Sequence, residues 1–252
     1  MNDILYTVDG RVATLSFNRP DKKNAITAAM YAAMAEGLRT AEADDAVRVI
    51  VICGKGGAFT AGNDLRDFLQ SPPKGNDSPV IRFMEALKDA GKPVIASVSG
   101  VAVGIGTTLL MHCDLVYAAE NARFALPFAQ LGLCPEYASS VLLQRLAGYQ
   151  RAAEILLFGE PFDADAAETI GLVNKQLAPE LLDDFVAAQA AKLAAMPADS
   201  VRTTKRLMKS ALAQSVNQSM QAELKEFMRL LSSPDAREAM SAFMEKRPPV
   251  FR

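Results

Sequence analysis

Three times along this chain, a short apolar stretch gives way to a loop and then to a helical pattern. The apolar stretches cover residues 47–53 (VRVIVIC), 93–99 (PVIASVS) and 114–119 (DLVYAA). Continuous apolar runs of this length indicate buried strands, and glycine-rich loops follow the first two. Because strands that alternate with helices belong to layered folds, the repeat predicts an α/β core.

The region before the first of these strands contains two further elements. Residues 4–17 predict a β-hairpin, because two β-rich runs flank Asp9-Gly10, a dipeptide typical of tight turns. A helix is predicted to begin after Thr27, whose hydroxyl suits a helix N-cap, and to end at Asp44-Asp45.

The last part of the chain changes to amphipathic helical patterns that are interrupted near Pro197 and Pro234. We therefore divide the chain into a core, residues 1–196, and a helical region, residues 197–252. The apolar residues of the helical region exceed what an isolated helix pair can cover, so they pack on the core or on another subunit. Ser71 to Pro79, rich in Pro, Gly, Ser, Asp and Asn, is predicted to be a mobile loop.

Composition excludes several classes of function. With 27 Lys and Arg against 29 Asp and Glu, the chain lacks the positive charge of a nucleic-acid-binding protein. No apolar run is long enough to span a membrane, and neither end resembles a signal peptide or a peroxisomal targeting signal, so we expect a cytoplasmic protein. Cys53, Cys113 and Cys134 lack CxxC spacing and are expected to be reduced core residues.

His112 is the only histidine, which excludes a metal site built from several histidines, and we expect no metal site. It lies between an apolar helical stretch and a buried strand, so we expect it in the core or at a helix end, where the helix C-terminus would stabilise its protonated form. Acid or base chemistry in this chain therefore falls to a carboxylate.

The two glycine loops, residues 59–65 (FTAGNDL) and 100–110 (GVAVGIGTTLL), suggest a site for a negatively charged oxygen. Backbone N–H groups point outward where a helix starts, and two such loops on neighbouring strands could aim two donors at one oxyanion. The alternative is that the glycines serve only tight strand-to-helix packing. Neither loop matches GxGxxG or a P-loop, so a nucleotide site is not indicated.

Five segments in this order resemble the crotonase superfamily, also called the enoyl-CoA hydratase/isomerase family. They are NRPDKKNA (18–25), AFTAGNDL (58–65), SGVAVGIG (99–106), the run from Cys113 to Glu136, and AMSAFMEKR (239–247). The resemblance implies a spiral of ββα units with a C-terminal helical trimerisation region, assembled as a trimer or a dimer of trimers. It also implies an acyl-CoA thioester substrate, with coenzyme A entering as part of that substrate and no separate cofactor.

By the same resemblance, the backbone N–H groups of Asn63 and Ile105 form the oxyanion hole. The substrate-binding positions that it implies are Ala61, Gly62, Asn63, Asp64, Leu65, Ile105 and Phe128. Asp64 is also expected to orient its own loop by accepting local N–H groups.

The carboxylates distinguish the reactions of this family. The positions of the two hydratase glutamates are occupied by Thr108 and Phe128, neither of which can transfer a proton as a carboxylate does. Glu136, in LGLCPEYASS, resembles the catalytic base of the peroxisomal-type Δ3,Δ2-enoyl-CoA isomerases, although Tyr137 stands where glycine is usual.

The resemblance therefore predicts an isomerase in which Glu136 moves a proton from C2 to C4 through a dienolate held by the oxyanion hole. Apolar neighbours are expected to raise the pKa of Glu136 and strengthen it as a base. Without the resemblance, Glu136 would be interpreted as an exposed acid in the first turn of a helix. The alternatives are a hydratase, another thioester-enolate enzyme such as a hydrolase or dehalogenase, and a non-catalytic acyl-CoA-binding protein.

A few other residues have possible roles toward coenzyme A. Lys22, Lys23, Lys246 and Arg247 could contact its phosphates or simply be solvated surface residues. Phe227 and Phe243 match family aromatics near the coenzyme A pocket, and core packing would explain them equally well. Cys134 is next to Pro135 but has no evident cationic partner, so it is not expected to be a nucleophile.

Overall fold

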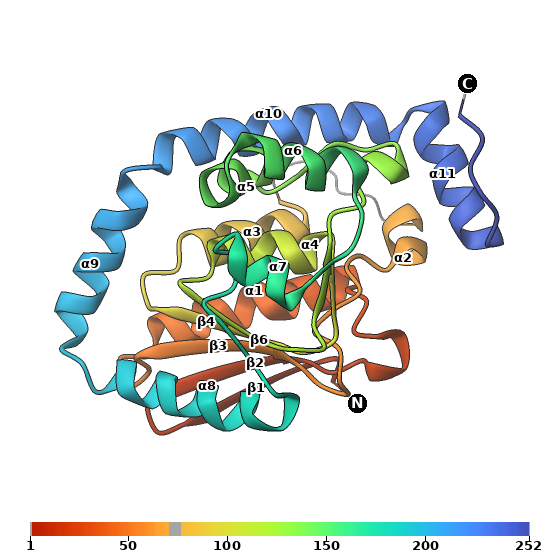
Figure 1. Cartoon of the computed structure of the whole chain (residues 1–252). Coiled ribbons are helices and arrows are strands. Elements are labelled where there is room, and N and C mark those ends of the chain that lie inside the picture. Colours follow the sequence, from red (N-terminus) through yellow and green to blue (C-terminus); the bar gives the residue numbers. More distant parts are fainter. Residues whose placement is uncertain (1, 71–76, 252) are drawn as a thin grey trace.

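A six-stranded sheet forms the base of the fold in the computed structural model, which describes residues 2–70 and 77–251 (Figure 1). Its strand order is β1-β2-β3-β4-β6-β9, with β1 antiparallel to β2 and all other neighbours parallel. The strands are β1 (Ile4–Asp9), β2 (Val12–Phe17), β3 (Val49–Gly54), β4 (Val94–Val98), β6 (Leu115–Ala119) and β9 (Lys175–Leu177). The predicted hairpin and the three predicted strands are confirmed.

Helices cover both faces of this sheet, which is why its central strands are apolar throughout. In β3, Ile50 and Ile52 belong to the main core with helices α1 (Ala28–Ala43) and α3 (Pro79–Lys88). Val49 and Val51 alternate with them and pack on the other side against α8 (Pro179–Ala194). Side chains of a strand alternate between faces, so a strand buried on both sides shows no polar alternation in its sequence.

A second, smaller sheet has the order β5-β7-β8. It contains β5 (Val101–Val103), β7 (Arg123–Ala125) and β8 (Phe162–Asp163). Each of β4 and β6 passes into one of its short strands and then into a helical turn. After β5 these turns are α4 (Ile105–Thr108) and η2 (Leu109–His112), and after β7 the turn is η3 (Ala129–Leu131), followed by α5 (Ser139–Ala147). The ββα repeat expected from the resemblance is present.

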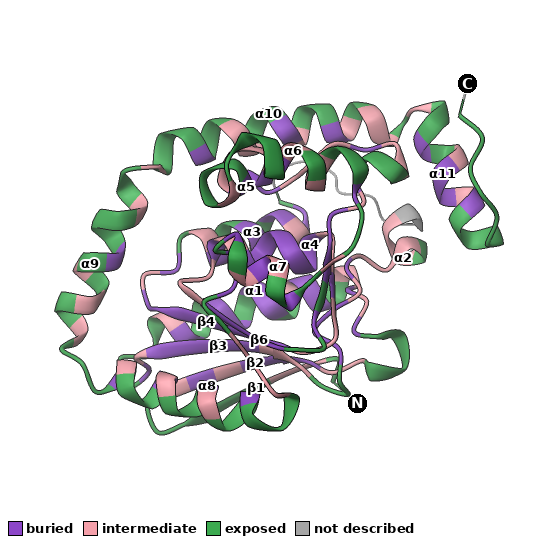
Figure 2. Ribbon diagram, viewed as in Figure 1, coloured by how far each residue is buried: buried purple, intermediate pink, exposed green. Residues whose placement is uncertain are grey.

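The C-terminal helices are α9 (Ala198–Ser210), α10 (Ala213–Leu231) and α11 (Pro234–Glu245). Breaks occur near Pro197 and Pro234, as the sequence predicts, and a further break separates α9 from α10. Figure 1 shows α9 rising along one side of the molecule and α10 lying across the top, over α5 and α6 (Tyr149–Phe158). The inner side of α10 is buried and its outer side is exposed (Figure 2). Phe227 of α10 and Met240 of α11 belong to the main core, so these helices pack on their own chain.

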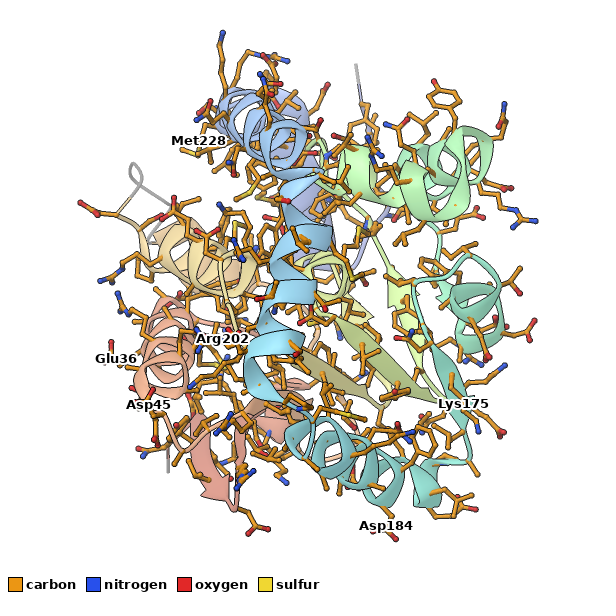
Figure 3. All side chains as sticks on the ribbon, turned by 90° about the vertical axis from the view of Figure 1, so that its left-hand side faces the viewer. Glu36, Asp45, Lys175, Asp184, Arg202 and Met228 are labelled. Carbon is orange, nitrogen blue, oxygen red and sulfur yellow. The ribbon has the colours of Figure 1, made fainter. Side chains whose placement is uncertain are left out.

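Helix α9 is fixed to the layer of the sheet by charged side chains. In Figure 3 it faces the viewer between α8 and α10, and its Arg202 pairs with Glu42 of α1 at 2.7 Å. Lys205 is buried and donates to Asp114, at the start of β6, at 2.6 Å. These contacts hold the path of the chain that leads to α10.

The remaining elements are η1 (Pro20–Lys22), α2 (Leu65–Gln70) and α7 (Ala164–Thr169). Of the loop predicted to be mobile, Ser71 to Pro79, residues 71–76 lie outside the described residues, and Pro79 begins α3. Across the described residues, no helix combines the length and the apolar character needed to cross a bilayer.

Candidate active site

The two glycine loops meet side by side, as their positions after neighbouring strands predict. The Thr60 N–H donates to Val101 O at 2.9 Å, and the Val103 N–H donates to Thr60 O at 3.1 Å. Gly62 has a φ of +83°, and a Cβ placed on it would lie 2.5 Å from Val103 O. Glycine is therefore required here by both its backbone conformation and the closeness of the second loop.

The two predicted oxyanion donors, one in each loop, have no acceptor among the backbone hydrogen bonds of the described residues. The bridge between Ile26 and Asn63 uses the N–H groups of Ile26 and Asp64, both 2.8–2.9 Å from their acceptors, and so leaves the Asn63 N–H unused among the described residues. Ile105 is the first residue of α4, where an N–H has no acceptor inside the helix. Both groups can therefore donate to a negatively charged oxygen.

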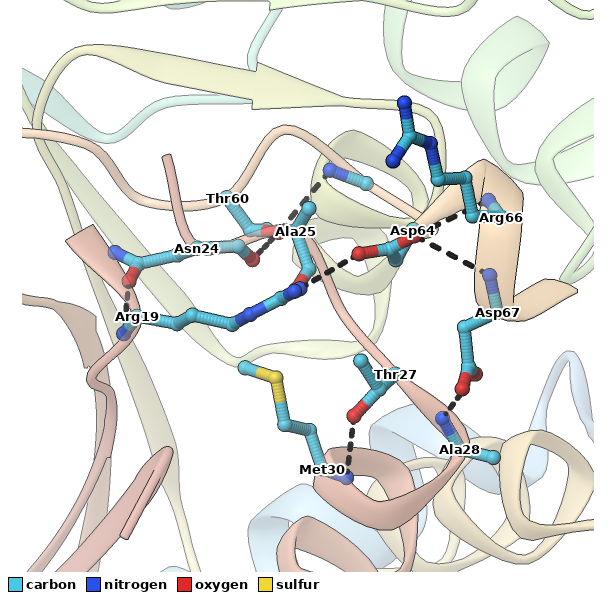
Figure 4. Close-up of polar contacts among 11 residues, drawn as sticks. Arg19, Asn24, Ala25, Thr27, Ala28, Met30, Thr60, Asp64, Arg66 and Asp67 are labelled. Atoms are coloured by element: carbon cyan, nitrogen blue, oxygen red, sulfur yellow. Dashed lines mark hydrogen bonds and ion pairs between the residues drawn. The ribbon is translucent and has the colours of Figure 1, made fainter. Parts of the chain in front are cut away.

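Asn24 holds the first loop through its side chain and its carbonyl, and Figure 4 shows its contact with Thr60. Its side-chain nitrogen donates to Ala58 O at 2.7 Å, and its own carbonyl accepts from the Thr60 hydroxyl at 2.7 Å. The same Thr60 oxygen accepts from the Gly62 N–H at 3.1 Å. The segment NRPDKKNA thus serves the loop AFTAGNDL as a rigid support.

Asp64 also supports the first glycine loop. Its carboxylate accepts from Arg19 at 2.7 Å and from the N–H groups of Arg66 and Asp67 at 3.1 and 3.3 Å, as Figure 4 shows. Burial alone would raise the pKa of Asp64, but these hydrogen bonds and the Arg19 charge lower it overall. Asp64 is therefore an ionised residue that orients its loop, in agreement with the role predicted for its local N–H contacts.

A cavity of about 130 Å³ brings Asn63 and Glu136 together. Its walls come from α2, α3 and α10, and they are mainly apolar. The apolar lining residues are Phe68, Val80, Ile81, Met84, Met220, Leu224, Phe227 and Met228. A larger cavity, of about 210 Å³, lies near Arg48 and Arg202 and includes no residue of either glycine loop.

The environment of Glu136 makes it a strong base for a carboxylate. Desolvation by burial, followed by the charge of Glu223, raises its pKa from 4.5 to about 8. The Thr108 hydroxyl opposes this only weakly, because it donates to Glu136 over 3.4 Å. Thr108, which occupies one hydratase glutamate position, is therefore beside Glu136 but cannot replace a carboxylate.

Of the predicted substrate-binding residues, Asn63 lines the cavity, whereas its lining does not include Ala61, Gly62, Asp64, Leu65, Ile105 or Phe128. Phe128 is 6% exposed and belongs to the main core. Ala61 and Leu65 flank Asn63 and are half-buried, with Leu65 as the first residue of α2. Phe227 lines the cavity, whereas Phe243 is 65% exposed on α11.

Of the predicted phosphate-binding cations, Lys23 lies beside the first loop, because its carbonyl accepts from the Ala61 N–H at 2.9 Å. Arg247, just beyond the end of α11, instead pairs with Glu238 and Glu245 of that helix, both at 2.6 Å. Lys22 and Lys246 are exposed.

His112 corrects one expectation. It is the last residue of η2, yet burial lowers its pKa from 6.5 to about 3, so it is neutral and gains nothing from a helix terminus. Its Nε2 lies 2.8 Å from Tyr137 O, and the two rings stack with centroids 3.7 Å apart. Desolvation outweighs the helix end because the ring is only 4% exposed.

The cysteines are all free thiols. Burial, helped by the charge of Glu223, raises the pKa of Cys134 to about 11, which keeps the thiol protonated. This agrees with the expectation that Cys134 is not a nucleophile.

Two residues of the site have no signal in the sequence. The Tyr31 hydroxyl on α1 donates to the side-chain oxygen of Asn63. Glu223 on α10 accepts from the N–H groups of Ala138 and Ser140, just after Glu136. Both contacts join residues far apart in the sequence, and Tyr31 and Glu223 are unremarkable members of amphipathic helices.

Comparison with known proteins identifies the family. The family model described as enoyl-CoA hydratase/isomerase matches residues 7–252. The 1,2-epoxyphenylacetyl-CoA isomerase of Escherichia coli is 35% identical, over 100% of this chain and 98% of its own length. Enoyl-CoA delta isomerase 2 of Rattus norvegicus is 33% identical, over 97% of this chain and 64% of its own length. Proteins named as hydratases are similarly close.

A solved structure of an enoyl-CoA hydratase/isomerase from Pseudoalteromonas atlantica T6c has the same fold. It is 37% identical, the two chains cover each other over 100% of their lengths, and the TM-score is 0.95. The fold predicted from the sequence, an α/β crotonase fold followed by C-terminal helices, is therefore confirmed.

Proposed function

The chain belongs to the enoyl-CoA hydratase/isomerase family, the acyl-CoA enzymes of crotonase fold, and on that premise we propose that it is a Δ3,Δ2-enoyl-CoA isomerase. The observation that carries the proposal is that, among the residues the structure describes, Glu136 is the one half-buried carboxyl group in an apolar cavity that it shares with Asn63. A second carboxylate on the wall, Glu85, is exposed at the rim.

In the proposed reaction, Glu136 removes a proton from C2 of a 3-enoyl-CoA. The electrons form a dienolate, whose oxygen accepts hydrogen bonds from the Asn63 and Ile105 N–H groups. Glu136 then returns the proton at C4, which leaves the double bond between C2 and C3 and the carboxylate regenerated. A carboxyl group with a pKa of about 8 suits this task, because it must act first as a base and then as an acid near neutral pH.

Hydration of a 2-enoyl ester requires two coordinated proton transfers, for which this site is poorly suited. Water added across a double bond has to be deprotonated while a proton is delivered to C2, and two carboxylates usually share this work in the family. Thr108 and Phe128 stand at those two positions, and Phe128 is in the core. An isomerase needs only one base, and coenzyme A arrives as part of the substrate, so the proposal requires no separate cofactor.

We also propose that the chain assembles with copies of itself, as a trimer or a dimer of trimers. This rests on the family resemblance and is supported by large apolar side chains on the outer helices. The most exposed of these on α9 and α11 are Leu207, Met208 and Phe243, which are 61%, 71% and 65% exposed.

The reaction is tested by offering the purified protein trans-3-hexenoyl-CoA and trans-2-hexenoyl-CoA separately. We expect the 3-enoyl ester to be converted to the conjugated 2-enoyl ester, seen by ultraviolet absorbance, and the 2-enoyl ester to gain little water, seen by chromatography. Glu136→Gln should lower kcat for isomerisation by about 10³, because the amide cannot accept the proton.

Glu85→Gln is the matched control, since it removes a carboxylate from the rim of the same cavity. It should keep most of the wild-type rate. Rapid hydration of the 2-enoyl ester without conversion of the 3-enoyl ester would contradict the isomerase proposal. Tight binding of both esters with no turnover of either would instead indicate a non-catalytic acyl-CoA-binding protein.

A further inference from the structure

The backbone directly after Glu136 has an unusual conformation. Tyr137 and Ala138 have φ values of +60° and +57°, and neither is glycine. Two consecutive side-chain-bearing residues in the left-handed region persist only where surrounding contacts hold them. This turn determines the direction of the Glu136 side chain, because it connects that residue to the fixed start of α5.

Contacts from three elements hold the turn. The Tyr137 hydroxyl donates to Met84 O of α3 at 2.6 Å, and the Tyr137 carbonyl lies 2.8 Å from His112 Nε2. Within the turn, the Ser139 hydroxyl donates to Glu136 O at 2.6 Å. Three further hydrogen bonds reach one carboxylate on α10, that of Glu223. It accepts from the N–H of Ala138 at 2.6 Å, from the N–H of Ser140 at 3.0 Å, and also from the Ser140 hydroxyl.

Glu223 is only 8% exposed, although it is a charged residue on a helix whose outer side faces solvent. Four donors surround it, including the Ser219 hydroxyl at 3.2 Å. A buried carboxylate with a complete set of donors is held in one place, and it loses much of its hydrogen bonding if the segment that supplies the donors moves. The carboxylate and the turn after Glu136 therefore fix each other.

We propose that Glu223 is a positioning residue for the catalytic base: it anchors residues 138–140 and so aims the Glu136 carboxyl group into the cavity that contains Asn63. This inference rests on the proposed function of Glu136. It gives α10 a role in the chemistry, in addition to its role as an apolar wall of the cavity.

The two carboxylates also differ in their hydrogen-bond partners. Burial raises the pKa of Glu223 above its ordinary value, and the donors from Ser140, Ala138 and Ser219 oppose this by favouring the ionised form. Glu136 has only the distant Thr108 hydroxyl. The charge of Glu223 then raises the pKa of Glu136, after the larger effect of burial. The other titratable groups around them lie on several elements. They are Tyr31 on α1, Glu85 on α3, Glu226 on α10, and Cys134 and Tyr137, which precede α5.

Glu223→Gln tests the proposal, with Glu226→Gln as its matched control. Glu226 is one turn further along α10, exposed and paired with Arg229, so its variant makes the same change of charge without touching the turn. In Glu223→Gln, an NH2 group, which can only donate, replaces one of the accepting oxygens, and the charge beside Glu136 is lost. We expect kcat for isomerisation to fall at least tenfold and the acid limb of kcat/KM to move about one pH unit lower. Glu226→Gln should change neither.

A second readout does not depend on catalysis. Carbon-13 NMR of the Glu136 carboxyl group reports its pKa, and hydrogen exchange reports the protection of the Ala138 and Ser140 amides. Both should fall in Glu223→Gln, even if the chain proves not to be an isomerase, which separates failure of this inference from failure of the proposed function. An unchanged Glu136 pKa together with unchanged amide protection in the folded variant would overturn the inference.

Ser140→Ala keeps the test decisive if Glu223→Gln does not fold. It removes one hydroxyl donor and leaves the charge in place. We expect faster exchange of the amides at 138–140 and at least a threefold loss of kcat. Wild-type values for both would overturn the positioning role.

Discussion

At the scale of single residues, the site depends on an unfavourable placement of Glu136. Its pKa in the folded chain, about 8, lies above its ordinary value of 4.5, so an unfolded chain releases this proton first as the pH rises. The stability that the protonated carboxyl group contributes is present below pH 4.5 and is lost as the pH rises to about 8. A useful base is thus obtained at the expense of stability at neutral and alkaline pH.

The variant Glu136→Gln tests this loss of stability at high pH. The amide stays neutral at every pH, so the variant should match the wild-type free energy of unfolding at pH 4 and exceed it by up to about 5 kcal/mol at pH 9, because each unit of the raised pKa corresponds to about 1.4 kcal/mol. Urea denaturation at both values measures the difference. A gain that is the same at pH 4 and pH 9, or a loss at pH 9, would contradict the raised pKa.

The sequence predicts some of these residues and misses others for a physical reason. Glu136, Asn63 and Ile105 lie in segments whose order along the chain carries the resemblance, so they are found from the sequence. Tyr31 and Glu223 act through contacts across 32 and 85 residues, to Asn63 and Ala138, and a helical pattern shows only which face of a helix is apolar. His112 is placed in the core correctly but assigned the wrong charge state, because desolvation depends on the packing around the ring.

At the scale of elements, the fold places the two donor loops side by side, so that their backbones are joined by hydrogen bonds. Long strands and long helices are recognised from the sequence because their apolar periodicity extends over several residues. Strand β5, of only three residues, lies inside a glycine-rich stretch and is defined by its pairing with β7. The sequence therefore predicts a loop over residues 100–106 where the structure has a strand that aligns the loop.

Gly62 is the element-scale position that is most sensitive to substitution. Gly62→Ala places a Cβ 2.5 Å from Val103 O, in addition to the strain of a positive φ. Gly57 has a φ of +75° but open space around it, so Gly57→Ala is the matched control for strain alone. We expect Gly57→Ala to cost about 1 kcal/mol and to keep its activity. Gly62→Ala should cost roughly twice as much or more and should lower kcat by about 10², because the Asn63 N–H is displaced.

Equal losses of stability and activity in the two variants would contradict the close approach of the loops. Thermal unfolding measures the cost of strain in each variant, and the isomerase assay measures the effect on the position of the Asn63 donor.

At the scale of the whole molecule, the helical region completes the site. Three of the cavity walls are on α2, α3 and α10, and α10 reaches its place through α9, which is fixed to the sheet by Arg202 and Lys205. The sequence predicts these helices and their breaks at Pro197 and Pro234. It leaves open whether they pack on their own core, because an apolar helix face shows that a partner exists without identifying it.

The exposed apolar residues that remain on α9 and α11 carry the prediction of self-association. Sedimentation velocity of the purified chain at micromolar concentration should give a mass of three or six chains. A double variant in which Leu207 and Met208 are both changed to Glu should have a lower mass. Arg206→Glu, on the same exposed helix, is the control and should keep the wild-type mass. A wild-type monomer at this concentration would contradict the proposed assembly.

The most direct test of the central claim is the pH dependence of kcat/KM for isomerisation of trans-3-hexenoyl-CoA. Only the ionised form of Glu136 can accept the C2 proton, so kcat/KM should rise with pH through a midpoint of about 8 and then level off. The low residual rate of Glu136→Gln should lack this rise. A wild-type midpoint near the ordinary 4.5 of a glutamate, or an unchanged rise in Glu136→Gln, would contradict the assignment of Glu136 as the base.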